Sequence, residues 1–175
     1  MGAPGYGFLN RPGLSGLFGA LMDEYARAAE GFCQVVEALA PGVYVRTRAS
    51  DDPDTTSRQM ICAHAVGAAH RYSDYIRKAR GMPTIEAFAA DPKGLATPAA
   101  VRPALAAAMQ YTEEALAGWY EDPSPAELVR FEVRWGPVYN PEMMLEHAIV
   151  HLLRHRRQIE RWPAQGSRRS SAGRG

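Results

Sequence analysis

Four long segments of this sequence carry apolar residues at steps of three and four, and this repeat limits the fold more than any other feature. The segments cover about residues 14–39, 56–80, 97–119 and 141–162. Such steps keep the apolar side chains on one side of an α-helix. Helices with a single apolar side cover it by packing on one another. We therefore expect an all-α fold, a four-helix bundle, and the long connections favour crossover links at least as much as an up-down order.

Residue types at the segment ends predict where helices begin and stop. Proline followed by glycine at 41–42 predicts the end of the first helix, because proline cannot continue the hydrogen-bond ladder. Thr56 and Gln59 have the spacing of a capping box, which predicts the start of the second helix. Asn140 as N-cap and Pro141 at the first helical position predict the start of the fourth.

Two short stretches have apolar residues at every second position instead. Phe131, Val133 and Trp135 alternate with charged residues, which suits a short strand or an extended lid segment. Residues 43–48 alternate in a similar way. Our hypothesis is that these stretches pair as a short two-stranded element in the loops. Residues 84–90 are expected to form a short helical turn.

Length and charge argue for one domain and against two classes of partner. The chain has 175 residues, enough to bury a sizeable core. Its 20 basic and 19 acidic residues leave a net charge of +1, too little to attract nucleic acid or an anionic membrane. We expect a single domain over residues 1–162. The tail at 163–175 is glycine, serine and arginine without an apolar pattern, which predicts disorder.

Cysteine use and hydropathy point to the cytoplasm. The two cysteines, Cys33 and Cys62, lie far apart and in no metal-binding spacing, which favours neither a disulfide framework nor a zinc ribbon. No apolar run approaches the roughly 18 residues that cross a bilayer. The first 12 residues also lack a basic segment followed by an apolar one. We expect a cytoplasmic protein that neither enters a membrane nor is secreted.

Three histidines stand out in the fourth predicted helix. His147, His151 and His155 follow one another at intervals of four residues, so they lie on one side of the helix. Two imidazoles so placed can share a metal ion. A stable divalent site needs at least three protein ligands, so a residue from another helix has to complete it. His64, a polar residue in the apolar row of the second helix, is our candidate.

Each histidine also has a simpler interpretation. A single histidine on an apolar face is most often a core residue with a hydrogen-bond partner. Several imidazoles buried without partners would each cost about 1–3 kcal/mol, and a shared cation removes that cost. His147 competes for a ligand position, because the pair His147 and His151 has the same spacing as His151 and His155. His70 and Cys62 are expected to point away from the core, with His70 at a surface or interface.

The two histidine segments resemble a known family. Residues 144–162, MLEHAIVHLLRHRRQIERW, and residues 58–76, RQMICAHAVGAAHRYSDYI, are similar to the DinB/YfiT-like superfamily of metal-dependent proteins. The resemblance implies a four-helix bundle with a three-histidine site. One ligand comes from the second helix and two from an H-x-x-x-H pair late in the last helix. By this resemblance His64, His151 and His155 are the ligands, with His147 as the alternative.

The resemblance also implies a range of activities. The superfamily includes thiol-dependent S-transferases and isomerases, as well as proteins described as hydrolases. It further implies a homodimer. Three neutral imidazoles leave an ion its full charge and at least one open position, which suits activation of water or binding of a thiolate. Zinc suits such a nitrogen site best, and nickel, iron and manganese are tolerated by it.

A general acid or base is expected near the ion. The candidates by sequence are Tyr72 and Tyr75, on the helix of His64, and Glu146 beside His147. The tyrosines also have the spacing of core residues, and Glu146 that of a solvated residue or one that orients a ligand. Arg154, Arg156 and Arg157 are candidates for binding an anionic thiol or a carboxylate, or they form a solvated face.

The sequence leaves three functions open. The first is a metal-dependent transferase that joins a low-molecular-weight thiol to a small electrophile. The second is a metal-dependent hydrolase. The third is a non-catalytic bundle, in which the ion is a structural brace or is absent.

Overall fold

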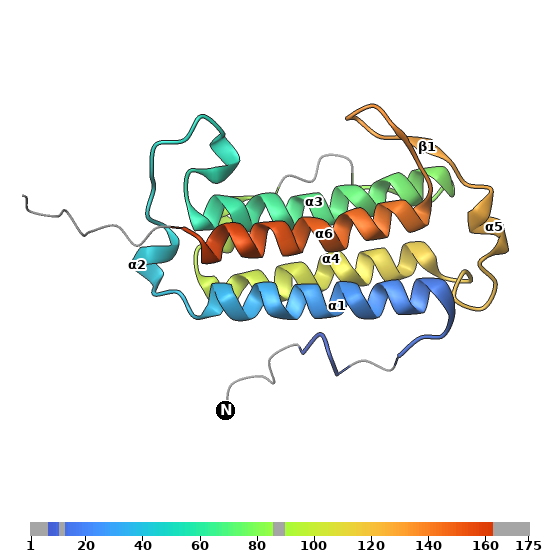
Figure 1. Cartoon of the computed structure of the whole chain (residues 1–175), viewed down its shortest axis with the longest axis horizontal. Coiled ribbons are helices and arrows are strands. Elements are labelled where there is room, and N and C mark those ends of the chain that lie inside the picture. The colour runs from blue at the N-terminus through green and yellow to red at the C-terminus, as the bar shows by residue number, and fades with distance from the viewer. Residues whose placement is uncertain (1–6, 11–12, 86–89, 163–175) are drawn as a thin grey trace, which may run out of the picture.

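The computed structural model describes residues 7–10, 13–85 and 90–162, and this part of the chain is mostly helical. Four long helices run side by side (Figure 1), and two short helices, three 3-10 turns and one two-stranded sheet lie in the connections. The long helices are α1 (Gly16–Glu37), α3 (Arg58–Ala79), α4 (Val101–Leu116) and α6 (Pro141–Glu160). The others are α2 (Pro41–Tyr44), η1 (Pro53–Thr55), η2 (Pro92–Leu95), η3 (Pro98–Ala100), α5 (Ser124–Glu127), β1 (Phe131–Glu132) and β2 (Val138–Tyr139).

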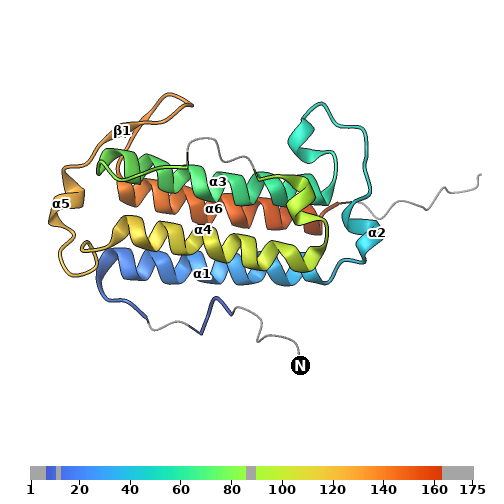
Figure 2. The ribbon, with the colours of Figure 1, turned by 180° about the vertical axis from the view of Figure 1, so that it is seen from behind.

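Each long helix packs closely on two of the other three. Helix α1 packs on α6 and α4, while α3 packs on α4 and α6. The front and back views show the same order of helices (Figures 1 and 2). The consecutive helices α1 and α3 are therefore not close neighbours, and neither are α4 and α6. Helices α3 and α6, which carry all five histidines, do lie side by side.

The buried side of each long helix is the apolar side that the periodicity predicts. Large side chains from all four helices are almost completely shielded from solvent. They include Met22, Tyr25, Phe32, Ile61, Ile76, Leu105, Met109, Leu116, Met144 and Leu145. Burying side chains of this size contributes about 1.5–3 kcal/mol each, so these contacts hold the helices in their relative positions.

Side-chain caps begin both histidine helices. The Asn140 side-chain oxygen accepts a hydrogen bond of 2.8 Å from the amide of Met143, which confirms the predicted N-cap of α6. The predicted capping box of α3 is wrong by one residue, because Ser57 is the N-cap and accepts from the amide of Met60. Gln59 instead donates to the carbonyl of Pro92, across to η2.

Two predictions about the connections are wrong. Helix α1 ends at Glu37, and Pro41 begins α2 instead of ending the first helix. Residues 43–48 form no strand, and β1 pairs antiparallel with β2, Phe131 opposite Tyr139. A hairpin closes a much shorter loop than a pairing with residues 43–48 would, which lowers its entropy cost. The turn contains Gly136 at φ +108°, a value that glycine adopts without strain.

His70 and Cys62 are buried, contrary to the prediction. Cys62 is fully shielded and His70 is 6% exposed, with its ring against Tyr111 of α4. The reason is that α3 is covered on several sides, by α4, α6, η1 and η2, so more than one of its faces is internal. The tail at 163–175 and most of the predicted turn at 84–90 lie outside the described residues.

A partly buried ion pair of Arg102 with two glutamates joins α1 to α4. The Arg102 guanidinium lies 2.7 Å from a carboxylate oxygen of Glu30 and 2.7 Å from one of Glu37. The Arg102 side chain is 13% exposed. Its hydrogen bonds lower the pKa of Glu30 below the usual range. The pair therefore fixes two carboxylates beside the core.

Replacing Arg102 tests how much this ion pair contributes to the free energy of unfolding. Arg102→Met keeps the apolar stem but leaves two partly buried carboxylates without their cation, so the free energy of unfolding should fall by about 2 kcal/mol. Urea unfolding measures it. The matched control is Arg27→Met, which removes an exposed pair with Glu24 on α1 and should cost less than about 0.5 kcal/mol. Equal losses in both variants would contradict this assignment.

Candidate metal centre

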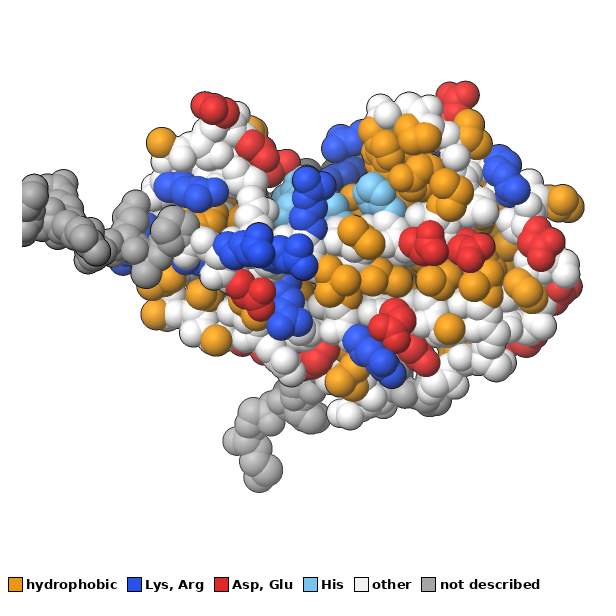
Figure 3. Space-filling view, in the orientation of Figure 1, with side chains coloured by type: hydrophobic (Ala, Val, Ile, Leu, Met, Phe, Trp, Pro, Cys, Tyr) orange, Lys and Arg blue, Asp and Glu red, His pale blue; other side chains and the backbone are white. Residues whose placement is uncertain are grey.

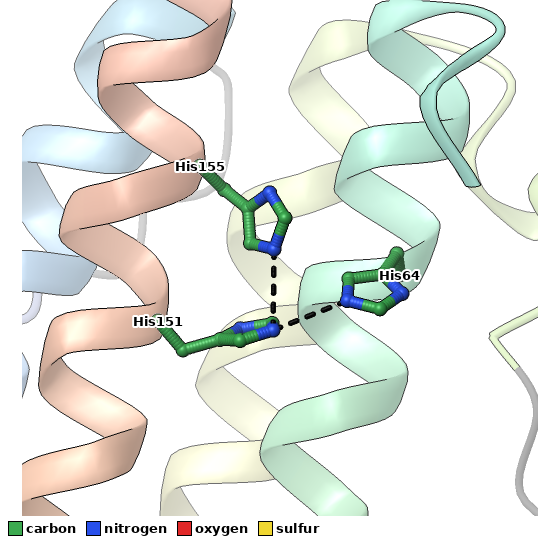
Figure 4. A group of neighbouring side chains, drawn as sticks. All are labelled: His64, His151 and His155. Carbon is green, nitrogen blue, oxygen red and sulfur yellow. Dashed lines mark hydrogen bonds between the residues drawn. The ribbon is translucent and has the colours of Figure 1, made fainter. Parts of the chain in front are cut away.

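Three histidines from two helices meet at one point. His64 of α3 and His155 of α6 each place the Nε2 atom 3.1 Å from the Nε2 of His151 (Figure 4). The three ligand atoms all lie within 4.8 Å of one another. Zinc–nitrogen bonds of about 2.0–2.1 Å in a tetrahedron separate neighbouring ligand atoms by about 3.3 Å. The prediction that these histidines lie close enough to share an ion is confirmed.

Hydrogen bonds on the far side of two rings set their orientation. The Nδ1 of His64 lies 2.7 Å from a carboxylate oxygen of Asp54, and the Nδ1 of His155 lies 2.9 Å from the side-chain oxygen of Gln158. Both oxygens only accept hydrogen bonds, so the proton of each neutral ring belongs on Nδ1. This tautomer leaves a lone pair on each Nε2, directed toward the shared centre.

The lone pairs need a common partner. His151 lies 3.1 Å from both of the other Nε2 atoms, yet its own Nε2 carries at most one proton to donate. One proton cannot satisfy two acceptors well at partly buried positions. A cation at the centre would satisfy all three nitrogens at once. The donor set therefore fits a divalent metal ion.

Burial keeps the rings of His151 and His155 neutral. Loss of solvent, together with the neighbouring His155 and His64 rings, lowers the pKa of His151 to about 2. Burial also lowers the pKa of His155. Both rings are therefore unprotonated at neutral pH and keep the lone pairs that a metal ion requires. Neutral ligands would leave the charge of a bound ion uncompensated.

Asp54 is a site residue that the sequence did not single out. It lies in η1, where Pro53 starts the turn and Asp52 accepts a hydrogen bond of 2.9 Å from the Asp54 amide. The turn packs on α3 and so carries the carboxylate to His64. The sequence shows only a turn-forming cluster here. Gln158 could have been found, because it follows His155 by three residues on one helix face.

His147 lies outside this group. Its ring stacks on Trp135, with 4.9 Å between ring centroids, and its Nδ1 lies 3.3 Å from the hydroxyl of Tyr139. The centroid of His147 is 6.3 Å from that of His151, against 4.3 Å between His151 and His155. The structure thus brings the later pair together and directs His147 toward the β1–β2 hairpin.

One cavity, which we call the aromatic cavity, opens beside His64 and His151. It encloses about 450 Å³. The tyrosines predicted near the site both line it. The remaining lining residues include cationic and aromatic side chains. They are Ala68, Arg71, Asp74, Lys78, Thr84, Arg134, Trp135 and His147.

The three predicted acid or base candidates have different surroundings. Tyr72 faces the centre, with its ring centroid 5.4 Å from that of His151, and burial raises its pKa to about 12. The Tyr75 hydroxyl accepts a hydrogen bond of 3.0 Å from the amide of Arg134, so it anchors the hairpin. Glu146 is exposed and lines neither cavity described here. Of the three, Tyr72 alone combines burial with contact to a candidate ligand.

A second hollow, the basic hollow, meets the same histidines from another side. It encloses about 460 Å³ and is lined by Arg154 and Arg157 of α6 and by Arg161, the residue directly after this helix. Arg156 does not line it and instead pairs with Glu160 at 2.9 Å. Figure 3 shows histidine side chains in a depression flanked by basic groups. The predicted arginine cluster is thus divided between the site and the surface.

Comparison with known proteins assigns neither a family nor a function to this chain. A scan against protein-family models and a search of the curated proteins gave no match to this chain. Within the described residues, no helix has both the length and the apolar content to span a bilayer.

Metal binding should depend on the three converging histidines. We expect about one zinc ion per chain, and His151→Ala should weaken binding at least 100-fold, because two ligands rarely hold a divalent ion. Competition with a chromophoric chelator measures the affinity. His147→Ala removes an imidazole one turn away and serves as the control. Loss of the ion in the His147 variant, with retention in the His151 variant, would contradict the assignment.

The Asp54 carboxylate should contribute through His64. Asp54→Ala removes the acceptor that fixes the tautomer and orientation of the ring, so zinc affinity should fall about 10- to 100-fold without loss of stoichiometry. The control is Asp51→Ala, which removes an exposed carboxylate from the same turn cluster. An equal decrease in both variants would mean that general charge, and not orientation of His64, is responsible.

Proposed function

We propose that this chain is a metal-dependent enzyme of the DinB/YfiT-like kind, most specifically a thiol-dependent S-transferase. The observation that carries the proposal is the three-histidine group, which borders both the aromatic cavity and the basic hollow. A purely structural ion would not need two openings. The packing order of α1, α6, α3 and α4 supports a four-helix bundle with crossover connections, as the family resemblance implies.

The bound ion would lower the pKa of a coordinated thiol, so that the sulfur is a thiolate at neutral pH. Zinc is the ion we propose first, with nickel, iron or manganese as alternatives. His64, His151 and His155 would hold it, oriented by Asp54 and Gln158. Because the ligands are neutral, they do not offset the charge that stabilises a thiolate.

The basic hollow suits the charged part of a small thiol. Arg154, Arg157 and Arg161 present three guanidinium groups within one hollow that also contains His64 and His151. Low-molecular-weight thiols commonly carry carboxylates, which guanidinium groups bind with two parallel hydrogen bonds. These arginines would hold the thiol with its sulfur toward the three histidines.

The transfer itself exchanges one bond for another. The sulfur forms a bond to an electrophilic carbon of the second substrate, the bond from that carbon to a leaving group breaks, and the leaving group departs with the electron pair. The thiol proton is released. Tyr72 stays protonated at neutral pH, so its hydroxyl can donate a hydrogen bond to the departing group.

The family resemblance leads us to propose a homodimer in the cytoplasm as well. Val150 and Leu153, three residues apart on α6, are 60% and 46% exposed. Large apolar side chains in solvent on one helix support a protein partner at this part of α6. Sedimentation of the purified chain distinguishes a monomer from a dimer.

Activity should require both the ion and a thiol. We would incubate zinc-loaded protein with 1-chloro-2,4-dinitrobenzene and, separately, with cysteine, glutathione and coenzyme A, and follow the thioether product by absorbance and mass. The expected result is a rate at least tenfold above the blank for one of these thiols, lost in His151→Ala and retained in Asp51→Ala, which removes an exposed carboxylate outside both hollows. Conversion to the phenol without thiol would favour the hydrolase, and no turnover of any kind would favour a non-catalytic metal site.

A further inference from the structure

The aromatic cavity has a lining of two kinds. Tyr72, Tyr75 and Trp135 supply aromatic surface, and Arg71, Lys78 and Arg134 supply positive charge. Its volume of about 450 Å³ falls in the range of small-molecule sites. A lining that combines rings with cations selects a ligand that is both flat and negatively charged.

The one acidic residue of the cavity is already engaged. Asp74 accepts a hydrogen bond of 2.6 Å from the Tyr111 hydroxyl and one of 3.1 Å from the amide of Ile85. Within the described residues, neither Arg71 nor Arg134 forms an ion pair with a carboxylate. Arg71 is only partly exposed. Arg71 and Arg134 therefore reach the cavity without a carboxylate in ion-pair contact, and with Lys78 they outnumber the single carboxylate among the described lining residues.

The cationic side chains lie close to the centre of the site. Arg71 and Arg134 line the same cavity as Tyr72, His64 and His151. A cationic region thus lies next to the residue that faces the three histidines.

The aromatic side chains pack on one another and form one wall of the cavity, on which a flat ring could lie. The Trp135 ring is nearly perpendicular to those of Tyr72 and Tyr75, at interplanar angles of 80° and 82° and centroid distances of 6.2 and 6.1 Å. Trp135 is 39% exposed, so part of its surface is uncovered. Rings pack favourably on one another at centroid distances of about 4.5–7 Å.

We propose that the aromatic cavity binds an aromatic carboxylate. Its ring lies among Trp135, Tyr72 and Tyr75, its carboxylate binds Arg71 and Arg134, and its remaining edge faces His151. This inference rests on the proposed function in one respect: the bound carboxylate is the electrophilic substrate of the proposed transferase. Binding of the carboxylate needs neither the ion nor the thiol.

Fluorine NMR on the metal-free protein tests the binding step by itself. The probe is 4-fluorobenzoate, compared with neutral 4-fluorobenzamide, which has the ring alone, and with fluoroacetate, which has the carboxylate alone. We expect 4-fluorobenzoate to bind at least tenfold more tightly than either. Binding of the amide as tight as that of the benzoate would overturn the proposal, and so would equal binding of fluoroacetate.

Single substitutions locate the binding. Arg71→Gln and Arg134→Gln should each weaken 4-fluorobenzoate at least fivefold, and Trp135→Leu should do the same. Arg27→Gln removes the same charge from the surface of α1, away from the cavity lining, and should leave the affinity unchanged. Arg134 is exposed on the hairpin, so its variant gives a folded test even where Arg71→Gln does not fold. An unaffected affinity in Arg134→Gln, or an equal decrease in Arg27→Gln, would refute the site.

The two proposals can fail separately. If 4-fluorobenzoate binds as expected and no thiol is transferred to any electrophile, the carboxylate site stands and the transferase does not. If transfer to 1-chloro-2,4-dinitrobenzene occurs and the benzoate does not bind, the carboxylate site is wrong and the transferase stands.

Discussion

The site depends on the axial register of α3 and α6. The Nε2 atoms of His64 and His151 belong to different helices and lie 3.1 Å apart. A slip of one helical turn moves a residue by about 5.4 Å, more than the distance that ligands of one ion can tolerate. The contacts between α3 and α6 hold this register, while the N-caps Ser57 and Asn140 fix where each helix begins. The packing of α3 on α6 therefore determines whether the three histidines can hold one ion.

The two hollows that border the three histidines have linings of different chemistry. The basic hollow is lined by Arg154 and Arg157 of α6 and by Arg161, whereas the aromatic cavity is lined by Trp135 on the hairpin and by tyrosines of α3. His64 and His151 border both hollows and are the side chains that the two linings share.

Features that depend on residues close together in the sequence could be predicted from the sequence alone. Steps of three and four predicted the long helices, and the Asn140 cap predicted the start of α6. The four-residue spacing left His147 and His155 as alternatives, and the family resemblance selected the group His64, His151 and His155 that the structure brings together. Contacts between distant segments were not predictable. Asp54 reaches His64 only because η1 packs on α3, and the hairpin pairs with itself instead of with residues 43–48. His70 is internal because α3 is covered on several sides, which its own periodicity does not reveal.

X-ray absorption at the zinc edge tests the central claim most directly, because it reports the ligands of the ion in solution. Protein without a histidine tag, loaded with one equivalent of zinc, should show three imidazole nitrogens at about 2.0–2.1 Å and at least one further light atom. In His64→Ala, measured at protein and zinc concentrations above its weakened Kd, the multiple-scattering signal of imidazole should fall by about a third. A spectrum with sulfur at about 2.3 Å, or one without imidazole scattering, would contradict the convergence of His64, His151 and His155 on one ion.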